Sequence, residues 1–196
     1  CNNPQAPSSP PTSTTQQTQG TNGTLKLLYW QAPTILNPHF SNGFKDAEAS
    51  RITLEPLASY DKNGKLIPFL AAEIPTTENG GVAKNGKSVT RKIKKGVKWS
   101  DGQPFTAKDV VFTYQFIANP KVATTTAGNY ATVKSVEAID DYTVKINFKE
   151  VNPAWFLVFV GGDGMILPRH LFEKYNGANA REAPTNKMPV GTGAYK

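Results

Sequence analysis

The chain has 196 residues, of which 38% are hydrophobic and 10% aromatic, so it is long and apolar enough for one domain with its own core. It contains no run of 18 apolar residues, and we therefore expect no transmembrane helix. The formal net charge of +7 permits attraction to acidic surfaces but does not by itself indicate nucleic acid, which we do not expect as a partner.

The basic residues are unevenly placed, and seven of them lie close together in the middle of the chain. No acidic residue interrupts the stretch from Lys84 to Lys98. We interpret this run as the solvated face of a strand and its loop, and a binding site for an acidic partner is the alternative. The run consists of Lys84, Lys87, Arg91, Lys92, Lys94, Lys95 and Lys98.

The first 23 residues differ in composition from the rest of the chain. They carry no charge and no aromatic side chain and are rich in Pro, Ser, Thr and Gln, so they cannot bury enough apolar surface to fold. We expect residues 1–23 to be a disordered tether and residues 24–196 to fold. The tether begins with Cys1, the only cysteine, so no intramolecular disulfide is expected.

Cys1 is interpreted as a lipid-anchor site. A secreted lipoprotein whose signal peptide has been removed begins with a cysteine that carries diacylglycerol, and two or three acyl chains hold a protein stably on a membrane. The alternative is that Cys1 only marks a cut in the chain. A role as an N-terminal nucleophile is disfavoured, because a thiol on a disordered tail is not held near its chemical partners.

The folded part begins with β-forming residues. Residues 24–30 (TLKLLYW) predict a buried first strand, and residues 32–38, which include two prolines, predict a loop. Apolar residues spaced among polar ones predict a short helix within residues 46–57. Asn63-Gly64 lies between two extended stretches and predicts a hairpin with a type I′ turn, because both residues tolerate a positive φ.

A helix cap is the clearest local signal in the middle of the chain. It follows an alternating strand at residues 89–93 and a turn at residues 100–102. Thr106 occupies the position of an N-cap, and Asp109 three residues later completes a capping box. The apolar residues that follow share one helical face as far as Ala118, and Pro120 ends the helix.

The last third of the chain combines a hairpin with short helices. Residues 133–139 and 142–148 alternate around Asp140-Asp141 and predict two paired strands. Residues 153–160 predict a short buried helix, residues 168–175 a helix with Pro168 in its first turn, and residues 189–196 an extended end. Hairpins with interspersed helices predict the mixed α/β (α+β) class rather than a βαβ alternation.

No known catalytic signature is present. The sequence lacks GxSxG, HExxH, CxxC and Walker motifs. Its two histidines, His39 and His170, lie in a predicted loop and a predicted helix, and the sequence indicates no third residue that would bind a metal ion with them. We therefore expect no catalytic residue, no metal site and no cofactor, and we interpret the protein as a non-enzyme.

Aromatic residues in predicted loops are candidates for ligand contact. Binding proteins use such rings for broad apolar contact, while backbone groups add directional hydrogen bonds. The candidates are Phe40, Phe44, Tyr130 and Trp155. Core packing is an open alternative for Phe40 and Phe44, and it is the favoured interpretation for Trp155.

Several stretches occur in an order that is specific when they are taken together. The most specific is residues 96–120, GVKWSDGQPFTAKDVVFTYQFIANP, and the others are ILNPHF, GKLIPFLAAEIP, VKSVEAIDDYTVKINF, ILPRHLFEKY and PVGTGAYK. Together they resemble the family 5 extracellular solute-binding proteins, which are the oligopeptide, dipeptide and nickel receptors of ABC importers. One departure is the stretch ENGGVAKNGK at residues 78–87, which is longer than the usual turn and is expected to be a surface insertion.

The resemblance implies a two-lobed periplasmic-binding-protein-like fold, of which residues 24–196 hold an incomplete first lobe while the second lobe is absent. In the family the ligand lies in the cleft between the lobes and closure buries it. The positions that should face this cleft are Asn42, Gly43, Phe44, Tyr130, Gly161 and Gly162.

The implied function is that of a monomeric, lipid-anchored receptor in the periplasm or on the outer face of the cell membrane. It would capture a small-molecule or peptide ligand and deliver it to the permease subunits of an ABC transporter. Peptide is the first expectation, and nickel chelates, sugars and other small solutes stay open. A secreted hydrolase and an acidic-surface-binding module are the alternatives from other classes.

Overall fold

The computed structural model describes residues 23–41 and 43–195. The expected tether, its lipid-anchor Cys1 and the expected ligand contact Asn42 therefore lie outside the described residues, apart from Gly23 at the end of the tether. The chain divides into residues 1–30 and residues 31–196, and each unit is described by itself.

The described part of the first unit forms no strand. Residues 24–30, expected to be a buried strand, carry no strand assignment and are exposed, with 72% of Trp30 accessible to solvent. The prediction was wrong for this structure. β-forming residues supply only the tendency to be extended, and a strand also needs a partner for its backbone groups. In the part of the chain that the structure describes, residues 24–30 take part in no β-ladder and no isolated β-bridge.

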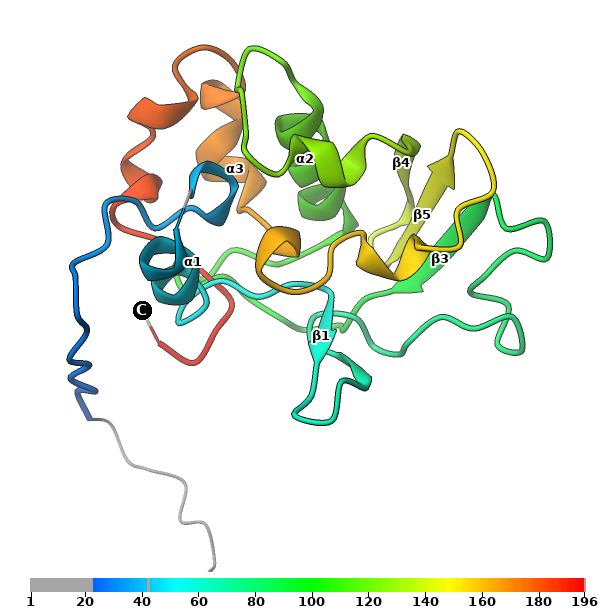
Figure 1. Ribbon diagram of the computed structural model, residues 1–196, viewed down its shortest axis with the longest axis horizontal. Coiled ribbons are helices and arrows are strands. Elements are labelled where there is room, and N and C mark those ends of the chain that lie inside the picture. Colours follow the sequence, from blue (N-terminus) through cyan, green and yellow to red (C-terminus); the bar gives the residue numbers. More distant parts are fainter. Residues whose placement is uncertain (1–22, 42, 196) are drawn as a thin grey trace, which may run out of the picture. The chain divides into compact units, whose positions relative to one another are not determined.

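The longest helix in the described residues of the second unit is α2 (Ala107–Ala118), which begins at the predicted cap (Figure 1). The capping box is confirmed: Thr106 accepts a hydrogen bond from the helix backbone, and the Asp109 carboxylate accepts one from the Thr106 N–H at 2.9 Å. The same carboxylate accepts a bond from the Arg169 N–H, which opens α3 (Arg169–Phe172). The cap therefore also joins two helices.

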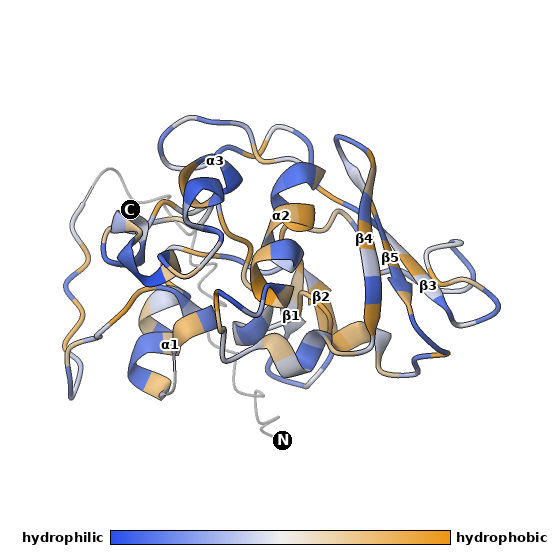
Figure 2. Ribbon diagram, turned by 90° about the horizontal axis from the view of Figure 1, so that it is seen from above, coloured by the Kyte–Doolittle hydropathy of each residue, from blue (hydrophilic) through white to orange (hydrophobic). Residues whose placement is uncertain are grey.

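The main sheet has three antiparallel strands in the order β3-β5-β4, with bounds β3 (Ser88–Lys92), β4 (Val133–Asp140) and β5 (Thr143–Phe148). The predicted hairpin around Asp140-Asp141 is confirmed as β4–β5. Helix α2 packs against β4 and β5, and Figure 2 shows it alongside β4. One face of the sheet is buried, and along β5 it presents Val144, Ile146 and Phe148.

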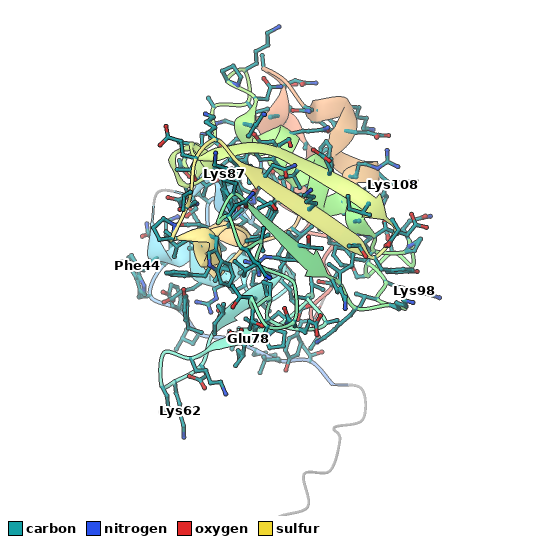
Figure 3. All side chains as sticks on the ribbon, turned by 90° about the vertical axis from the view of Figure 1, so that its right-hand side faces the viewer. Phe44, Lys62, Glu78, Lys87, Lys98 and Lys108 are labelled. Carbon is teal, nitrogen blue, oxygen red and sulfur yellow. The ribbon has the colours of Figure 1, made fainter. Side chains whose placement is uncertain are left out.

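A second, two-stranded hairpin pairs β1 (Ala58–Tyr60) with β2 (Leu66–Pro68). Its tip, marked by Lys62 in Figure 3, projects from the body of the molecule. The hairpin is confirmed, but its turn is not type I′, because only Gly64, at φ +77°, has a positive φ. Instead the Asp61 carboxylate accepts hydrogen bonds from the Asn63 and Lys65 N–H groups, so a side chain closes a longer loop.

Three short elements differ from their sequence predictions in extent. The helix expected within residues 46–57 is α1 (Phe44–Ser50). The helix expected at residues 168–175 is α3 continued by the 3₁₀ turn η5 (Glu173–Tyr175). The buried helix expected at residues 153–160 is only the 3₁₀ turn η3 (Trp155–Leu157), none of whose residues is buried. Short apolar runs do not fix their own helical length, because packing supplies most of the stability.

The core contains a cluster of aromatic rings among its aliphatic side chains. The Phe116 ring from α2 lies 5.6–5.9 Å, centroid to centroid, from the rings of Phe40, Phe112 and Phe172. Phe40 is thus a core residue, whereas 81% of Phe44 is exposed. No helix among residues 23–41 and 43–195 is both long and apolar enough to cross a bilayer.

The run of basic residues is not one continuous solvated face. Lys87 and Lys98 are exposed, as expected of a solvated run. Arg91, in contrast, has 0% exposure and lies on the buried face of β3. The interpretation of the run as a surface was therefore wrong for Arg91. Along an extended strand, alternate side chains face opposite sides, and position 91 falls on the same side as Val89.

Candidate functional site

Three loop segments that are distant in sequence meet in the second unit. The first contains η1 (Pro38–Phe40), the second η2 (Ala127–Tyr130) and the third η4 (Gly162–Gly164), and η1 packs against η4. The first two segments are joined at Thr125, whose N–H donates to the His39 carbonyl at 2.8 Å. Its hydroxyl also lies within hydrogen-bond distance of the carbonyls of His39 and Ser41. We call these segments the three-loop cluster.

His39 connects all three segments through its ring. Nε2 lies 2.8 Å from the Met165 carbonyl, which can only accept, so the neutral ring carries its proton on Nε2. Nδ1 then accepts from the Thr126 hydroxyl, which lies at 2.8 Å. Complete burial lowers the pKa of His39 to about 4. His39 is therefore a neutral structural link, a role that the sequence alone did not indicate.

The second and third segments are joined at Asp163. The Tyr130 hydroxyl donates to the Asp163 carbonyl at 3.2 Å, and the Asn129 side chain donates to the Asp163 carboxylate at 3.0 Å. The Tyr130 ring is 4% exposed and packs edge-on against Phe159, with 5.3 Å between ring centroids. Burial raises the pKa of Tyr130, so its hydroxyl stays protonated at neutral pH.

The third segment turns sharply between Phe159 and Gly164. Phe159 has a left-handed φ of +58°, which is costly for an aromatic residue, and Gly161 has φ +66° and ψ −157°. A Cβ on Gly164 would lie 2.2 Å from the Phe159 carbonyl carbon, so only glycine fits there. The turn is held from outside the cluster, because the Gly161 N–H donates to the Ala58 carbonyl of β1 at 2.9 Å.

The first segment ends at the start of α1. The Ser41 hydroxyl donates to the Gly43 carbonyl at 2.9 Å, while Gly43 has extended backbone and forms the N-cap of α1. Phe44 follows as the first helical residue, and its side chain projects outward in Figure 3. This segment thus ends with the large apolar side chain of Phe44 in solvent. The space beside the preceding Gly43 is open, because a Cβ added there would meet no atom within 4 Å.

The structure brings the described candidate residues onto adjoining loops. Tyr130 and the Gly161-Gly162 pair meet through Asp163, and Gly43 and Phe44 are linked to them through Ser41 and Thr125. Tyr130 is buried, and its hydroxyl supports the third segment by donating to the Asp163 carbonyl. Direct ligand contact by Gly43, Phe44, Tyr130, Gly161 and Gly162 stays a prediction, as it does for Asn42.

A hollow of about 630 Å³ lies away from these loops, at the end of β3 and the β4–β5 turn. Its wall mixes Lys92, Lys94 and Lys95 with Asp140 and Asp141, so its charges largely balance. Lys95 acts electrostatically on Asp140, whose pKa lies below its usual value chiefly because its carboxylate accepts a backbone hydrogen bond from Tyr142. The hollow therefore lacks the single sign of charge that an acidic partner would require.

The cluster offers hydrogen-bonding backbone and apolar contact rather than reactive groups. Among residues 23–41 and 43–195, no three His, Cys, Asp or Glu side chains are placed to hold a metal ion. The described His170 and Asp101 approach each other, with 2.6 Å between Nε2 and Oδ2, but they lie at the α2–α3 junction rather than in the cluster.

Comparison with known proteins identifies a family of solute-binding proteins and relatives named as oligopeptide-binding proteins. The family described as "Bacterial extracellular solute-binding proteins, family 5 Middle" matches residues 65–196. The oligopeptide-binding protein AppA of Bacillus subtilis is 32% identical over 167 residues, which cover 84% of this chain and 29% of AppA. The periplasmic oligopeptide-binding protein OppA of Salmonella typhimurium is 29% identical over 178 residues, covering 82% of this chain and 31% of OppA.

Solved structures agree with the sequence comparison. AppA from Bacillus subtilis in complex with a nonapeptide gives a TM-score of 0.74 at 28% identity, over 83% of this chain and 31% of AppA. NikZ from Campylobacter jejuni in complex with Ni(L-His) gives 0.71 at 31% identity, over 85% of this chain and 31% of NikZ. The mixed α/β class is confirmed, and the chain spans 29–31% of the length of these relatives.

Proposed function

Because the chain belongs to the family 5 bacterial extracellular solute-binding proteins, we propose that it is part of a receptor that captures a small solute for an ABC importer. A peptide is the solute proposed first. The relatives named as oligopeptide-binding proteins support this choice, as does the AppA structure with a nonapeptide. Ni(L-His) in the NikZ structure keeps a metal chelate as the second candidate.

The observation that carries the proposal is the convergence of the three-loop cluster. It joins turns with accessible backbone, at Gly43 and Gly162, to an exposed ring at Phe44. Extended peptides bind through main-chain hydrogen bonds, and apolar surface accepts their side chains without strong selectivity. In this proposal the cleft has two walls, and the second wall belongs to a second lobe. The first wall is formed by Asn42, Gly43, Phe44, Tyr130, Gly161 and Gly162.

The proposed setting is outside the cytoplasm. OppA, a relative, is named as a periplasmic protein. We place this receptor in the periplasm or on the outer face of the cell membrane, with a lipid on Cys1 and residues 1–23 as a tether. It acts as a monomer that a permease recognises in its closed, ligand-bound form, and it catalyses no reaction.

Native mass spectrometry of the full-length protein, purified from its own cells, tests this proposal. The expected spectrum shows a series of bound peptide masses that disappear after denaturation and refolding in clean buffer. A diacylglyceryl mass on the N-terminal peptide is expected as well, and a Cys1→Ser variant should lack it. A ligand-free protein that binds neither an added peptide pool nor a nickel chelate would contradict the receptor assignment.

A further inference from the structure

Arg91 is a charged side chain enclosed by the protein. It lies in β3 opposite Val144 of β5, and its side chain has 0% exposure. One guanidinium nitrogen, Nη2, donates to the Val158 carbonyl at 3.2 Å. The other two nitrogens, Nε and Nη1, are buried and have no hydrogen-bond partner among residues 23–41 and 43–195. Three N–H bonds are thus left without an acceptor.

The described part of the chain supplies no negative charge to pair with this cation. Within the described residues, no carboxylate lies at ion-pair distance from Arg91. Tyr130 and Tyr60 act on it electrostatically, and the centroid of the Trp155 ring lies 5.9 Å from its guanidinium carbon. Burial lowers the pKa of Arg91 to about 10, so the group remains charged at neutral pH. A buried unpaired charge is strongly unfavourable, and an apolar side chain would suit this position better.

The cover over Arg91 is one short segment, whose Val158 end is buried in the core. It consists of residues 154–158, which include η3 and run beside β3 (Figure 1). Its exposed side chains, Phe156 and Leu157, are 37% and 52% accessible. Its internal backbone hydrogen bonds measure 3.1 Å from the Leu157 nitrogen to the Ala154 oxygen and 3.4 Å from the Val158 nitrogen to the Trp155 oxygen. The strained Phe159 follows directly, and strain of this kind concentrates at clamps and switches.

The cover also belongs to the candidate site, because Phe159 packs on Tyr130 and leads into the turn at Gly161. We propose that Arg91 is a carboxylate-binding residue of the receptor: when residues 154–158 move aside, a carboxylate of the bound peptide docks on its guanidinium. This inference rests on the proposed function and adds a preference for solutes that carry a carboxylate.

The chemistry of the pocket favours a carboxylate over a neutral group. Guanidinium presents its donors in a planar fork that matches a carboxylate, and such charge-assisted bonds are about twice as strong as neutral ones. The carboxylate has two sources in a peptide, the C-terminus and an Asp or Glu side chain. Both satisfy the same donors, so the experiment must separate them.

The test uses three peptide pools and ligand-free, full-length protein. The first contains random tripeptides to pentapeptides without acidic residues, as free acids. The second contains the same sequences as C-terminal amides, and the third contains amides with one Glu each. Affinity for each pool is measured by competition against one fluorescent peptide. We expect the wild type to prefer the first or the third pool over the second by about tenfold or more, and Arg91→Met to lose that preference.

Lys92→Met is the matched control. It removes the same formal charge from the neighbouring position of β3, where the side chain is 64% exposed and pairs with Glu73. We expect this variant to keep the preference. Arg91→Lys keeps the charge without the fork and should show a reduced preference of the same sign, which preserves the test if Arg91→Met does not fold.

The outcomes separate the inference from the function on which it rests. Equal binding of all three pools by wild type and Arg91→Met would overturn the role of Arg91 and leave the peptide receptor intact. Failure of the wild type to bind any pool would instead refute the peptide function itself. The melting temperature gives a further check: ligand-free Arg91→Met should melt no lower than wild type. A large loss would mean that a protein group already pairs with Arg91, which also overturns the inference.

Discussion

The imidazole Nε2 of His39 lies 2.8 Å from the carbonyl oxygen of Met165, although the two residues are 126 positions apart in the chain. This contact holds the first loop of the three-loop cluster against the third. Protonation would leave the Nε2–H donor in place, but it would put a charge on a completely buried ring and remove the Nδ1 acceptor that the Thr126 hydroxyl uses. The cluster should therefore respond to acid.

The first prediction concerns pH. The pKa of His39 falls from 6.5 in the unfolded chain to about 4 in the fold, so between these values the unfolded state binds more protons. The free energy of unfolding should decrease as the pH falls from 6.5 towards 4, by up to about 3 kcal/mol from this residue. Urea unfolding at several pH values measures this. In His39→Gln the part of the slope that comes from residue 39 should vanish, and an unchanged slope would contradict the assignment.

The second prediction concerns the contact between the C-terminal segment and the turn after α1. A Cβ on Gly191 would lie 1.8 Å from the Thr53 carbonyl oxygen, so the backbone would have to move. Gly191→Ala should reduce the free energy of unfolding by about 1–3 kcal/mol, as overpacking does. Gly128→Ala is the control, because no atom lies within 4 Å of the added Cβ. Equal unfolding midpoints for the two variants would refute the proposed contact.

The third prediction separates two adjacent glycines. Gly161 has φ +66° and ψ −157°, a conformation essentially restricted to glycine, whereas a Cβ on Gly162 would meet open space and its φ is not positive. Gly161→Ala should cost about 1–3 kcal/mol of stability. Gly162→Ala should leave the melting temperature unchanged but weaken peptide binding, if a ligand backbone approaches there. Unaltered affinity in a folded Gly162→Ala protein would remove Gly162 from the site.

The fourth prediction contrasts two phenylalanines of the first loop. Phe44 is 81% exposed, so Phe44→Ala should leave stability within about 0.5 kcal/mol of wild type and reduce affinity for peptides. Phe40 is 3% exposed and packs on Phe116, so Phe40→Ala should cost about 3–5 kcal/mol. Calorimetric titration with a peptide and thermal unfolding measure both effects. Normal peptide binding by Phe44→Ala would argue against Phe44 as a ligand contact.

Several elements of the fold could be predicted because their signals are local. Thr106 and Asp109 satisfy helix N–H groups within three residues of one another, so the start of α2 is fixed by sequence. The alternation around Asp140-Asp141 likewise set the β4–β5 hairpin. In contrast, residues 24–30 have the composition of a strand, but a strand depends on a distant partner that composition does not specify.

The sequence by itself determined the capped helix, the two hairpins, the family resemblance and the candidate loops, because each depends on neighbours in the chain. The tertiary structure alone decided that His39 is a buried link, that Phe159 is left-handed and that Arg91 is enclosed with no counter-charge from the described residues. The physical reason is that burial and pairing are properties of segments brought together from far apart. Whether a charged or strained residue is tolerated depends on the whole fold around it.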